Sequence, residues 1–78
     1  MDIKVVGMGC DKCDQLYLNV KEALKILGQE VEVDKVEDLV EIVKLGVMTA
    51  PTLMVNGKAH APGRVLSTDA VVEILKKV

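Results

Sequence analysis

The stretch GMGCDKC at residues 7–13 carries both cysteines of the chain and joins a short apolar segment, residues 3–6, to an amphipathic helical pattern. We therefore expect a strand, a tight loop and then a helix that begins at the cysteines. A helix N-terminus presents unsatisfied N–H groups and the positive end of the helix dipole, and both stabilise a thiolate. The sequence thus predicts an exposed, attacking Cys10 at the cap and a shielded, resolving Cys13 in the first turn.

The spacing of the two cysteines suits a reversible disulfide. Residues three apart on a helix have Cβ atoms about 5–6 Å apart, whereas a disulfide needs about 3.5–4.5 Å. The gap closes if Cys10 lies outside regular helical geometry. Of the two residues between the cysteines, Lys12 favours a thiolate and Asp11 opposes it, so we assign both a role in tuning the thiol pKa.

Length and composition indicate one small domain, residues 1–78, with an aliphatic core. Half of the residues are hydrophobic, and Tyr17 is the only aromatic residue. The net charge is −2 and the basic residues form no cluster, which argues against a nucleic-acid partner.

The sequence also contains no apolar run long enough for a membrane span and no basic segment followed by an apolar stretch near Met1. We therefore expect no membrane partner and a cytoplasmic location. In a reducing cytosol, a CxxC pair is typical of redox chemistry or metal binding and not of a structural staple.

Apolar periodicity predicts the first half of the chain. A helix should end at Gly28, an alternating strand should follow at residues 31–35, and a second helix should end at Gly46. The first helix is expected to bury Leu16, Val20, Ala23, Leu24 and Leu27. The second is expected to bury Val36, Leu39, Val40 and Val43.

Turn and cap residues predict the second half. Residues 49–51 introduce an apolar strand at 52–55, and Asn56-Gly57 is a strong signal for a hairpin with a return strand at 58–61. Ser67 or Thr68 should cap a last helix with Val71, Ile74, Leu75 and Val78 on its inner face. The predicted order is β-α-β-α-β-β-α, an α/β fold.

The loop at residues 7–13 resembles the Gly-Met-x-Cys-x-x-Cys loop of heavy-metal-associated domains, which carry copper or zinc between two thiolates. Those domains have a βαββαβ order that ends on a strand, whereas this chain is predicted to end in a capped helix. A metal-carrier function is thus the alternative. Two thiolates alone leave a zinc site short of its usual four ligands.

Residues 49–52, Thr-Ala-Pro-Thr, followed by a hairpin, resemble the cis-proline segment and terminal hairpin of thioredoxin-fold proteins. Together with the CxxC loop, the resemblance covers the whole chain, and it is closest to the short thioredoxin-like and glutaredoxin-like proteins called redox-active disulfide protein 2. It implies a central four-stranded mixed sheet flanked by three helices. It also implies a protein disulfide reductase with a cis Ala50–Pro51 bond beside the cysteines.

The resemblance has further implications for the site. Ala50 and Pro51 would bind an extended target segment, and Met8 and Met48 are candidates for an apolar rim around it, although methionines more often fill gaps. No cofactor or metal is expected beyond the Cys10–Cys13 disulfide itself. The expected partners are disulfide-containing proteins and an electron donor, either a reductase or a small thiol, and we expect a monomer.

Three positions depart from the thioredoxin pattern. Gly9 replaces the tryptophan before the first cysteine, Lys4 stands where thioredoxins keep a buried acid, and Asp11-Lys12 replaces the usual CxxC interior. Outside the motifs, we expect His60 to face solvent and Tyr17 to pack in the core with its hydroxyl at the surface. Gly63 resembles the glycine that approaches glutathione in glutaredoxins.

Overall fold

The computed structural model describes residues 2–8, 11–47 and 49–77. Over these ranges the elements are β1 (Ile3–Val6), α1 (Asp11–Ile26), β2 (Val33–Val36), α2 (Leu39–Lys44), β3 (Thr52–Val55), β4 (Lys58–His60) and α3 (Thr68–Lys77). The element order and the α/β class are the predicted ones.

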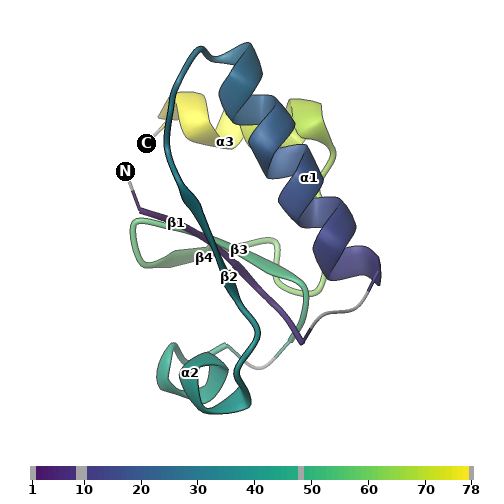
Figure 1. Cartoon of the computed structure of the whole chain (residues 1–78), viewed down its shortest axis with the longest axis vertical. Coiled ribbons are helices and arrows are strands. Elements are labelled where there is room, and N and C mark those ends of the chain that lie inside the picture. The colour runs from purple at the N-terminus through teal and green to yellow at the C-terminus, as the bar shows by residue number, and fades with distance from the viewer. Residues whose placement is uncertain (1, 9–10, 48, 78) are drawn as a thin grey trace.

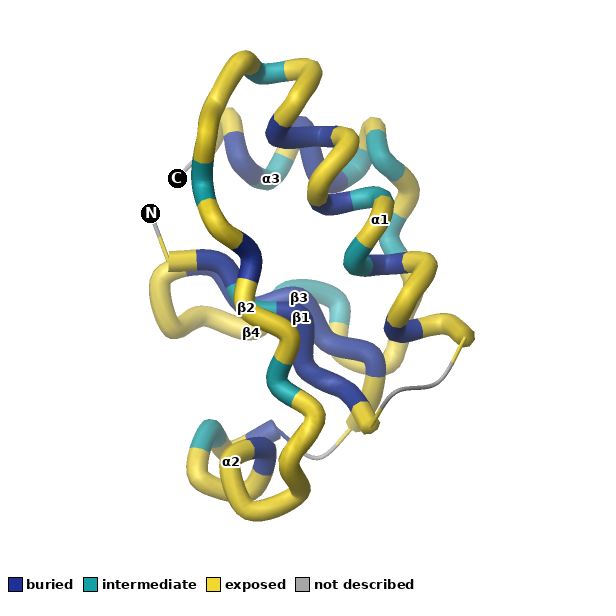
Figure 2. Tube along the Cα trace, viewed as in Figure 1, coloured by how far each residue is buried: buried dark blue, intermediate teal, exposed yellow. Residues whose placement is uncertain are grey.

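The strands of the described residues form one four-stranded sheet in the order β2-β1-β3-β4. β2 runs parallel to β1, and the other neighbours are antiparallel, so the sheet is mixed as predicted. Figure 1 shows α1 and α3 on one face of the sheet and α2 on the other. The central strands β1 and β3 are the most deeply buried strands (Figure 2). None of the helices in the described ranges is long and apolar enough to cross a bilayer.

Helix α1 forms where the apolar spacing predicts it, and it ends by a defined hydrogen-bond motif. Gly28 has a φ of +67°, its N–H donates to the Lys25 carbonyl at 3.1 Å, and the N–H of Gln29 donates to the Leu24 carbonyl at 3.0 Å. These two bonds are those of a Schellman motif, which needs a left-handed residue where Gly28 stands. α2 ends in the same way at Gly46, whose φ is +74°.

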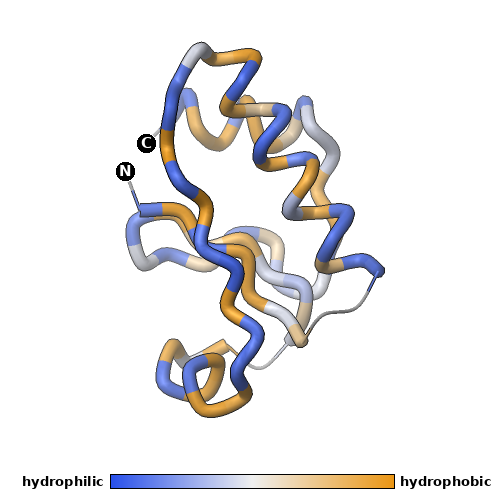
Figure 3. The backbone as a smooth tube through the Cα atoms, in the orientation of Figure 1, coloured by the Kyte–Doolittle hydropathy of each residue, from blue (hydrophilic) through white to orange (hydrophobic). Residues whose placement is uncertain are grey.

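The prediction for the buried stripe of α2 was wrong. Leu39, Val40 and Val43 are 56%, 58% and 67% exposed, and Ile42 is the buried residue of the helix. α2 is therefore largely hydrophobic in Figure 3 but mostly exposed in Figure 2. At 3.6 residues per turn, Ile42 lies at one edge of the apolar arc and Val40 at the other, and only the Ile42 edge meets the sheet.

The C-terminal hairpin turns at Asn56 and Gly57, both with positive φ (52° and 81°), as a type I′ turn requires. The return strand β4 ends at His60, one residue earlier than predicted, because Ala61 has a φ of 44° and leaves the extended conformation. α3 then starts at the predicted cap. The Ser67 hydroxyl accepts from the Ala70 N–H at 3.2 Å.

The inner face of α3 also differs slightly from the prediction. Val71 and Leu75 are buried as expected, but Val72 is buried as well, and Ile74 is only partly buried against the core. Val78 lies outside the described residues.

Candidate functional site

Cys13 lies in the first turn of α1 and is 2% exposed. Asp11 and Lys12, which precede it on the helix, are both exposed. Gly9 and Cys10 lie outside the described residues, so the attacking role of Cys10 and its disulfide with Cys13 remain predictions. The described helix places a buried sulfur next to the positive end of a helix dipole, which is a place that favours a thiolate.

Gly7 makes room for the Cys13 sulfur. A Cβ atom on Gly7 would overlap Cys13 Sγ, and it would lie 3.2 Å from Cys13 Cβ and 3.6 Å from Ala50 Cβ. The backbone at the end of β1 therefore lies between the first turn of α1 and the segment before β3. Three parts of the chain that are distant in sequence meet at Gly7.

The segment before β3 has the geometry of a fixed turn. The Ala50–Pro51 peptide bond is cis, Pro51 is buried and Ala50 is exposed. The Pro51 carbonyl accepts from the Gly63 N–H at 2.9 Å, and the buried Thr52 hydroxyl donates to the Thr49 carbonyl at 2.8 Å. These two bonds fix the turn on either side of Ala50, an exposed residue close to Gly7.

Gly63 contributes to this turn and approaches Thr49. Its φ is +78°, and a Cβ atom there would lie 3.6 Å from Thr49 Cβ. The resemblance to the glutathione-approaching glycine is not tested by these contacts, but they place Gly63 at the same end of the molecule as Cys13.

Of the two methionines predicted to form a rim, Met8 is 63% exposed beside Gly7. Met48 lies outside the described residues. An exposed apolar side chain that follows Gly7 in the chain suits a contact surface for a target protein.

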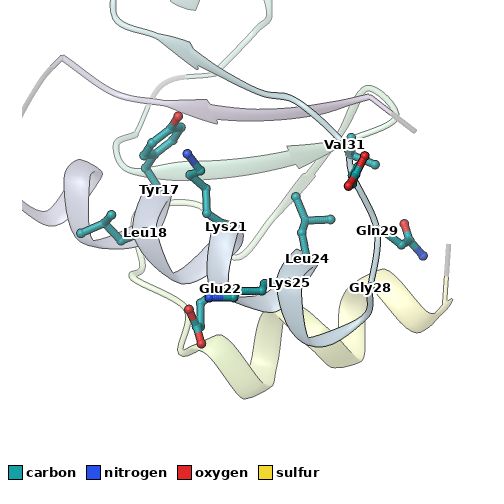
Figure 4. A pocket seen from close by; sticks show the side chains of 10 residues that line it. Tyr17, Leu18, Lys21, Glu22, Leu24, Lys25, Gly28, Gln29 and Val31 are labelled. Carbon is teal, nitrogen blue, oxygen red and sulfur yellow. The ribbon is translucent and has the colours of Figure 1, made fainter.

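One hollow of the described residues lies away from this site. It has a volume of about 710 Å³ and lies beside the C-terminal half of α1 and residues 28–31, with Tyr17, Lys21 and Leu24 among its lining side chains (Figure 4). A smaller hollow of about 290 Å³ borders Thr49 and Thr52 on the α2 side of the sheet. Cys13, Ala50 and Pro51 line neither hollow.

An ion-pair cluster links the first turn of α1 to β2. Lys35 Nζ lies 2.5 Å from Asp14 Oδ1 and 3.5 Å from Glu37 Oε1, and it lies 5.2 Å from the centre of the Tyr17 ring. The hydrogen bond to Asp14 raises the pKa of Lys35 above its ordinary value of 10.5, with smaller contributions from the charges of Asp14 and Glu37. Lys35 is therefore an ammonium ion at neutral pH.

Lys4, at the position where thioredoxins keep a buried acid, pairs with Asp2. Its Nζ lies 2.8 Å from Asp2 Oδ1, and this hydrogen bond raises the pKa of Lys4. Lys4 is paired with Asp34 and Met54 across the sheet, on the face opposite to that of Val5. The Lys4 ammonium thus belongs to the face covered by α2.

The expectation for His60 was wrong. His60 lies opposite Leu53 in the sheet and is partly buried, and its Nε2 atom is buried without a hydrogen-bond partner among the described residues. The reason is the pleat, which turns His60 toward the face covered by α1 and α3. Tyr17 is partly buried against the main core, and the ammonium groups of Lys21 and Lys35 lie 5.4 and 5.2 Å from its ring centre.

Three residues of this region were not identified from the sequence: Gly7, Asp14 and Lys35. A glycine at the end of a strand and directly before a CxxC loop is a signal of close backbone approach. Strand alternation with Val33 puts Lys35 on the same face of β2 as that buried residue, and a lysine there needs an acidic partner or a route to solvent. Neither signal identifies Asp14 as the partner.

No cluster of three or more His, Cys, Asp or Glu side chains that could hold a metal ion occurs in ranges 2–8, 11–47 and 49–77. Cys10 lies outside these ranges, so the geometry of a two-cysteine metal site is not described.

Comparisons with known proteins support the fold assignment independently of the site geometry. A family model described as "Thioredoxin domain" matches residues 1–76. A thioredoxin of Methanothermobacter thermautotrophicus is 36% identical over 75 residues, which cover 96% of this chain and 97% of that protein. A thioredoxin of Methanocaldococcus jannaschii is 36% identical over 74 residues, which cover 95% of this chain and 85% of that protein.

Two solved structures have the same fold. One is thioredoxin-2, described as a component of malaria parasite protein secretion machinery, with a TM-score of 0.68 and 20% identity over 99% of this chain and 84% of that one. The other is a malarial protein with a TM-score of 0.66 and 20% identity, over 99% of this chain and 97% of that one. At 20% identity these likenesses establish the thioredoxin fold and nothing finer.

Proposed function

The chain belongs to the thioredoxin domain family, and from this premise we propose that it reduces protein disulfides with Cys10 as the nucleophile and Cys13 as the resolving thiol. Family membership supports a thiol–disulfide oxidoreductase in general. The reduction of protein disulfides and the roles of the two cysteines are our proposal.

One observation carries the proposal for this chain. The buried Cys13 lies in the first turn of α1, and Gly7 brings it next to Ala50 of the cis-proline turn. This arrangement combines a shielded thiol, a helix N-terminus and an exposed backbone segment. A resolving cysteine needs the first two, and the docking of a target chain needs the third.

The proposed chemistry consists of two exchange steps. The Cys10 thiolate attacks one sulfur of the target disulfide, a Cys10–target disulfide forms, and the other target sulfur leaves as a thiolate that takes up a proton. Cys13, as a thiolate, then attacks Cys10 Sγ, and the second target sulfur leaves. The target disulfide gains two electrons, and the Cys10–Cys13 dithiol loses them.

Ala50 is proposed to dock the target chain during this exchange. It is exposed, whereas the Pro51 carbonyl is already paired with Gly63. In this proposal the Ala50 backbone pairs with an extended target segment in the manner of an added strand. Met8 would border that segment, and Met48 is proposed to do the same.

The proposed cycle needs an electron donor, either a thioredoxin reductase or a small thiol, and a reducing compartment such as the cytoplasm. The oxidised protein can be incubated with NADPH and a thioredoxin reductase, or separately with glutathione. The system that reduces the oxidised protein to two free thiols identifies the class of electron donor.

Trapping of mixed disulfides tests the roles of the cysteines. We expect Cys13→Ser to accumulate Cys10-linked disulfides with targets and the matched variant Cys10→Ser to accumulate none. Limited alkylation of the reduced wild type should modify Cys10 first, as read by mass spectrometry. First modification of Cys13 would reverse the assigned roles.

Reduction of insulin disulfides tests the activity itself. We expect the reduced protein to catalyse it and any bound copper or zinc to be weak and dispensable. Tight, stoichiometric metal in protein purified without reductant, together with no reductase activity, would favour the metal-carrier alternative.

A further inference from the structure

Asp14 and Lys35 form a charge pair at the first turn of α1. Asp14 follows Cys13 in the first turn of α1, and β2 projects Lys35 toward it with a distance of 2.5 Å between Nζ and Oδ1. Lys35 lies on the sheet face covered by α1, since it is paired with Val5, whose side chain belongs to that core. The exposed fractions of the Lys35 and Asp14 side chains are 33% and 52%, so the pair is only partly screened by water.

The position of Asp14 creates an electrostatic problem for a thiolate. A carboxylate in the first turn of a helix is favourable to the helix dipole, but it opposes any negative sulfur at the same helix end. Asp11 adds a second carboxylate in that turn, and Lys12 is the only cation of the same turn. Without a further cation, the first turn of α1 would carry a net negative charge.

Lys35 supplies that cation from another element. Its ammonium group contacts the Asp14 carboxylate, lies near Glu37 and lies 5.2 Å from the centre of the Tyr17 ring. The other neighbouring segments add little charge. Residues 49–52 carry no ionisable side chain, the segment with Gly63 adds Arg64, and Lys4 of β1 is paired with Asp2.

We propose that Lys35 is a positioning residue for the CxxC pair: by holding and neutralising Asp14, it keeps the first turn of α1 favourable to a cysteine thiolate. This role rests on the proposed redox function, and it adds a residue from β2 to the site. Lys35 does not contact the target in this proposal. It acts through Asp14.

The test compares thiol titration in four variants: Lys35→Gln, Lys35→Arg, Asp14→Asn and the double variant Asp14→Asn/Lys35→Gln. Alkylation rates of the reduced proteins are measured from pH 5 to 10, and the modified cysteine is identified by mass spectrometry. A single charge near a surface thiol changes its pKa by a few tenths. We expect Lys35→Gln to raise the apparent pKa of the more reactive thiol by roughly 0.4 and to slow its alkylation at neutral pH about twofold.

The remaining variants separate charge from structure. Lys35→Arg should keep the wild-type thiol titration. Asp14→Asn should lower the apparent pKa of the more reactive thiol, and the thiol of the double variant should titrate near that of the wild type. Lys44→Gln is the matched control, since Lys44 pairs with Glu41 on α2 at 3.9 Å. A purely structural role for Lys35 would lower the unfolding midpoint without moving the thiol titration.

The proposal fails if Lys35→Gln titrates like the wild type, or if the double variant keeps the whole effect of Lys35→Gln. Salt offers a second check, because 1 M NaCl should shrink the difference between Lys35→Gln and wild type. Insulin reduction by the wild type is measured separately. Inactivity there overturns the proposed function, whereas an unchanged thiol titration overturns the role of Lys35.

Discussion

The two faces of the central sheet are packed to very different depths. On one face, α1 and α3 enclose a cluster of side chains that are at most 9% exposed. Its most buried members, at 1% or less, include Ile3, Leu16, Val20, Leu53 and Val71. On the other face, α2 covers a smaller cluster of described residues, Val6, Ile42, Val47 and Met54. The exposed apolar residues of α2 show that this helix contributes only one edge to its cluster.

The difference indicates which part of the molecule holds the site. Cys13, the proposed resolving cysteine, lies in the first turn of α1, whose buried side chains belong to the larger cluster. α2 has six residues and few buried contacts, and such elements open locally at lower free energy than the rest of a domain.

The largest effect is expected for Leu53→Ala in β3. Leu53 is fully buried at the centre of the larger cluster, and truncation there should lower the free energy of unfolding by about 3–5 kcal/mol. Urea unfolding followed by circular dichroism measures it. A loss below about 1 kcal/mol would show that this face is not tightly packed.

The second prediction concerns Ile42→Ala, the counterpart on the α2 face. Ile42 is 7% exposed, and the small cluster can relax around the lost atoms, so we expect a loss of about 2 kcal/mol. The same urea measurement applies. A loss equal to that of Leu53→Ala would remove the contrast between the faces.

The third prediction tests the close contact at Gly7. Gly7→Ala inserts a methyl group against Cys13 Sγ, and we expect a loss of about 1–2 kcal/mol. Gly7 is not among the glycines with positive φ, so the contact and not backbone strain is tested. In the Cys13→Ala background the sulfur is absent, and Gly7→Ala should then cost less, with only the 3.2 Å contact to the Cβ atom of residue 13 left. An equal loss in both backgrounds would assign the effect elsewhere.

The fourth prediction compares the two N-caps, Asp38 of α2 and Ser67 of α3. Each side chain accepts from a backbone N–H of its first turn, and removal by alanine should cost about 1 kcal/mol in either helix. The effect on amide hydrogen exchange should differ between the two helices. Asp38→Ala should speed exchange within α2 alone, whereas α3 should stay protected in Ser67→Ala because the larger cluster holds it. Equal acceleration in both helices would contradict the contrast.

Local signals predicted most of the fold. Apolar spacing identified α1, and Gly28, Gly46 and Asn56-Gly57 marked turns that their positive φ values confirm. Each of these features depends on residues close in the chain. The order of the elements then followed, and with the two motifs it was enough to recognise the thioredoxin fold.

The errors concern features that depend on how elements dock. The buried edge of α2 is set by its position over Val6 and Met54, which its own apolar arc does not reveal. The strand β2 starts at Val33 and not at residue 31 because its pairing with β1 begins opposite Ile3. His60 was misplaced because the register of β4 decides the face on which it lies.

The candidate site was predictable only in part, for the same reason. The positions of Cys13 and Pro51 follow from motifs. The approach of Gly7 to Cys13 and the pairing of Lys35 with Asp14 require the packing of α1 against the sheet, which no local pattern encodes.

The smallest effect is expected for Val43→Ser on the outer side of α2. Val43 is 67% exposed, valine and serine have similar helix propensities, and the change should alter the free energy of unfolding by less than about 0.5 kcal/mol. Val20→Ser in α1 is the matched control, since Val20 is fully buried and should lose several-fold more. Both are measured by urea unfolding at two protein concentrations. A loss above about 1 kcal/mol for Val43→Ser, growing with protein concentration, would mean that another copy of the chain covers α2 in solution. The α2 side of the molecule would then be an interface between two copies.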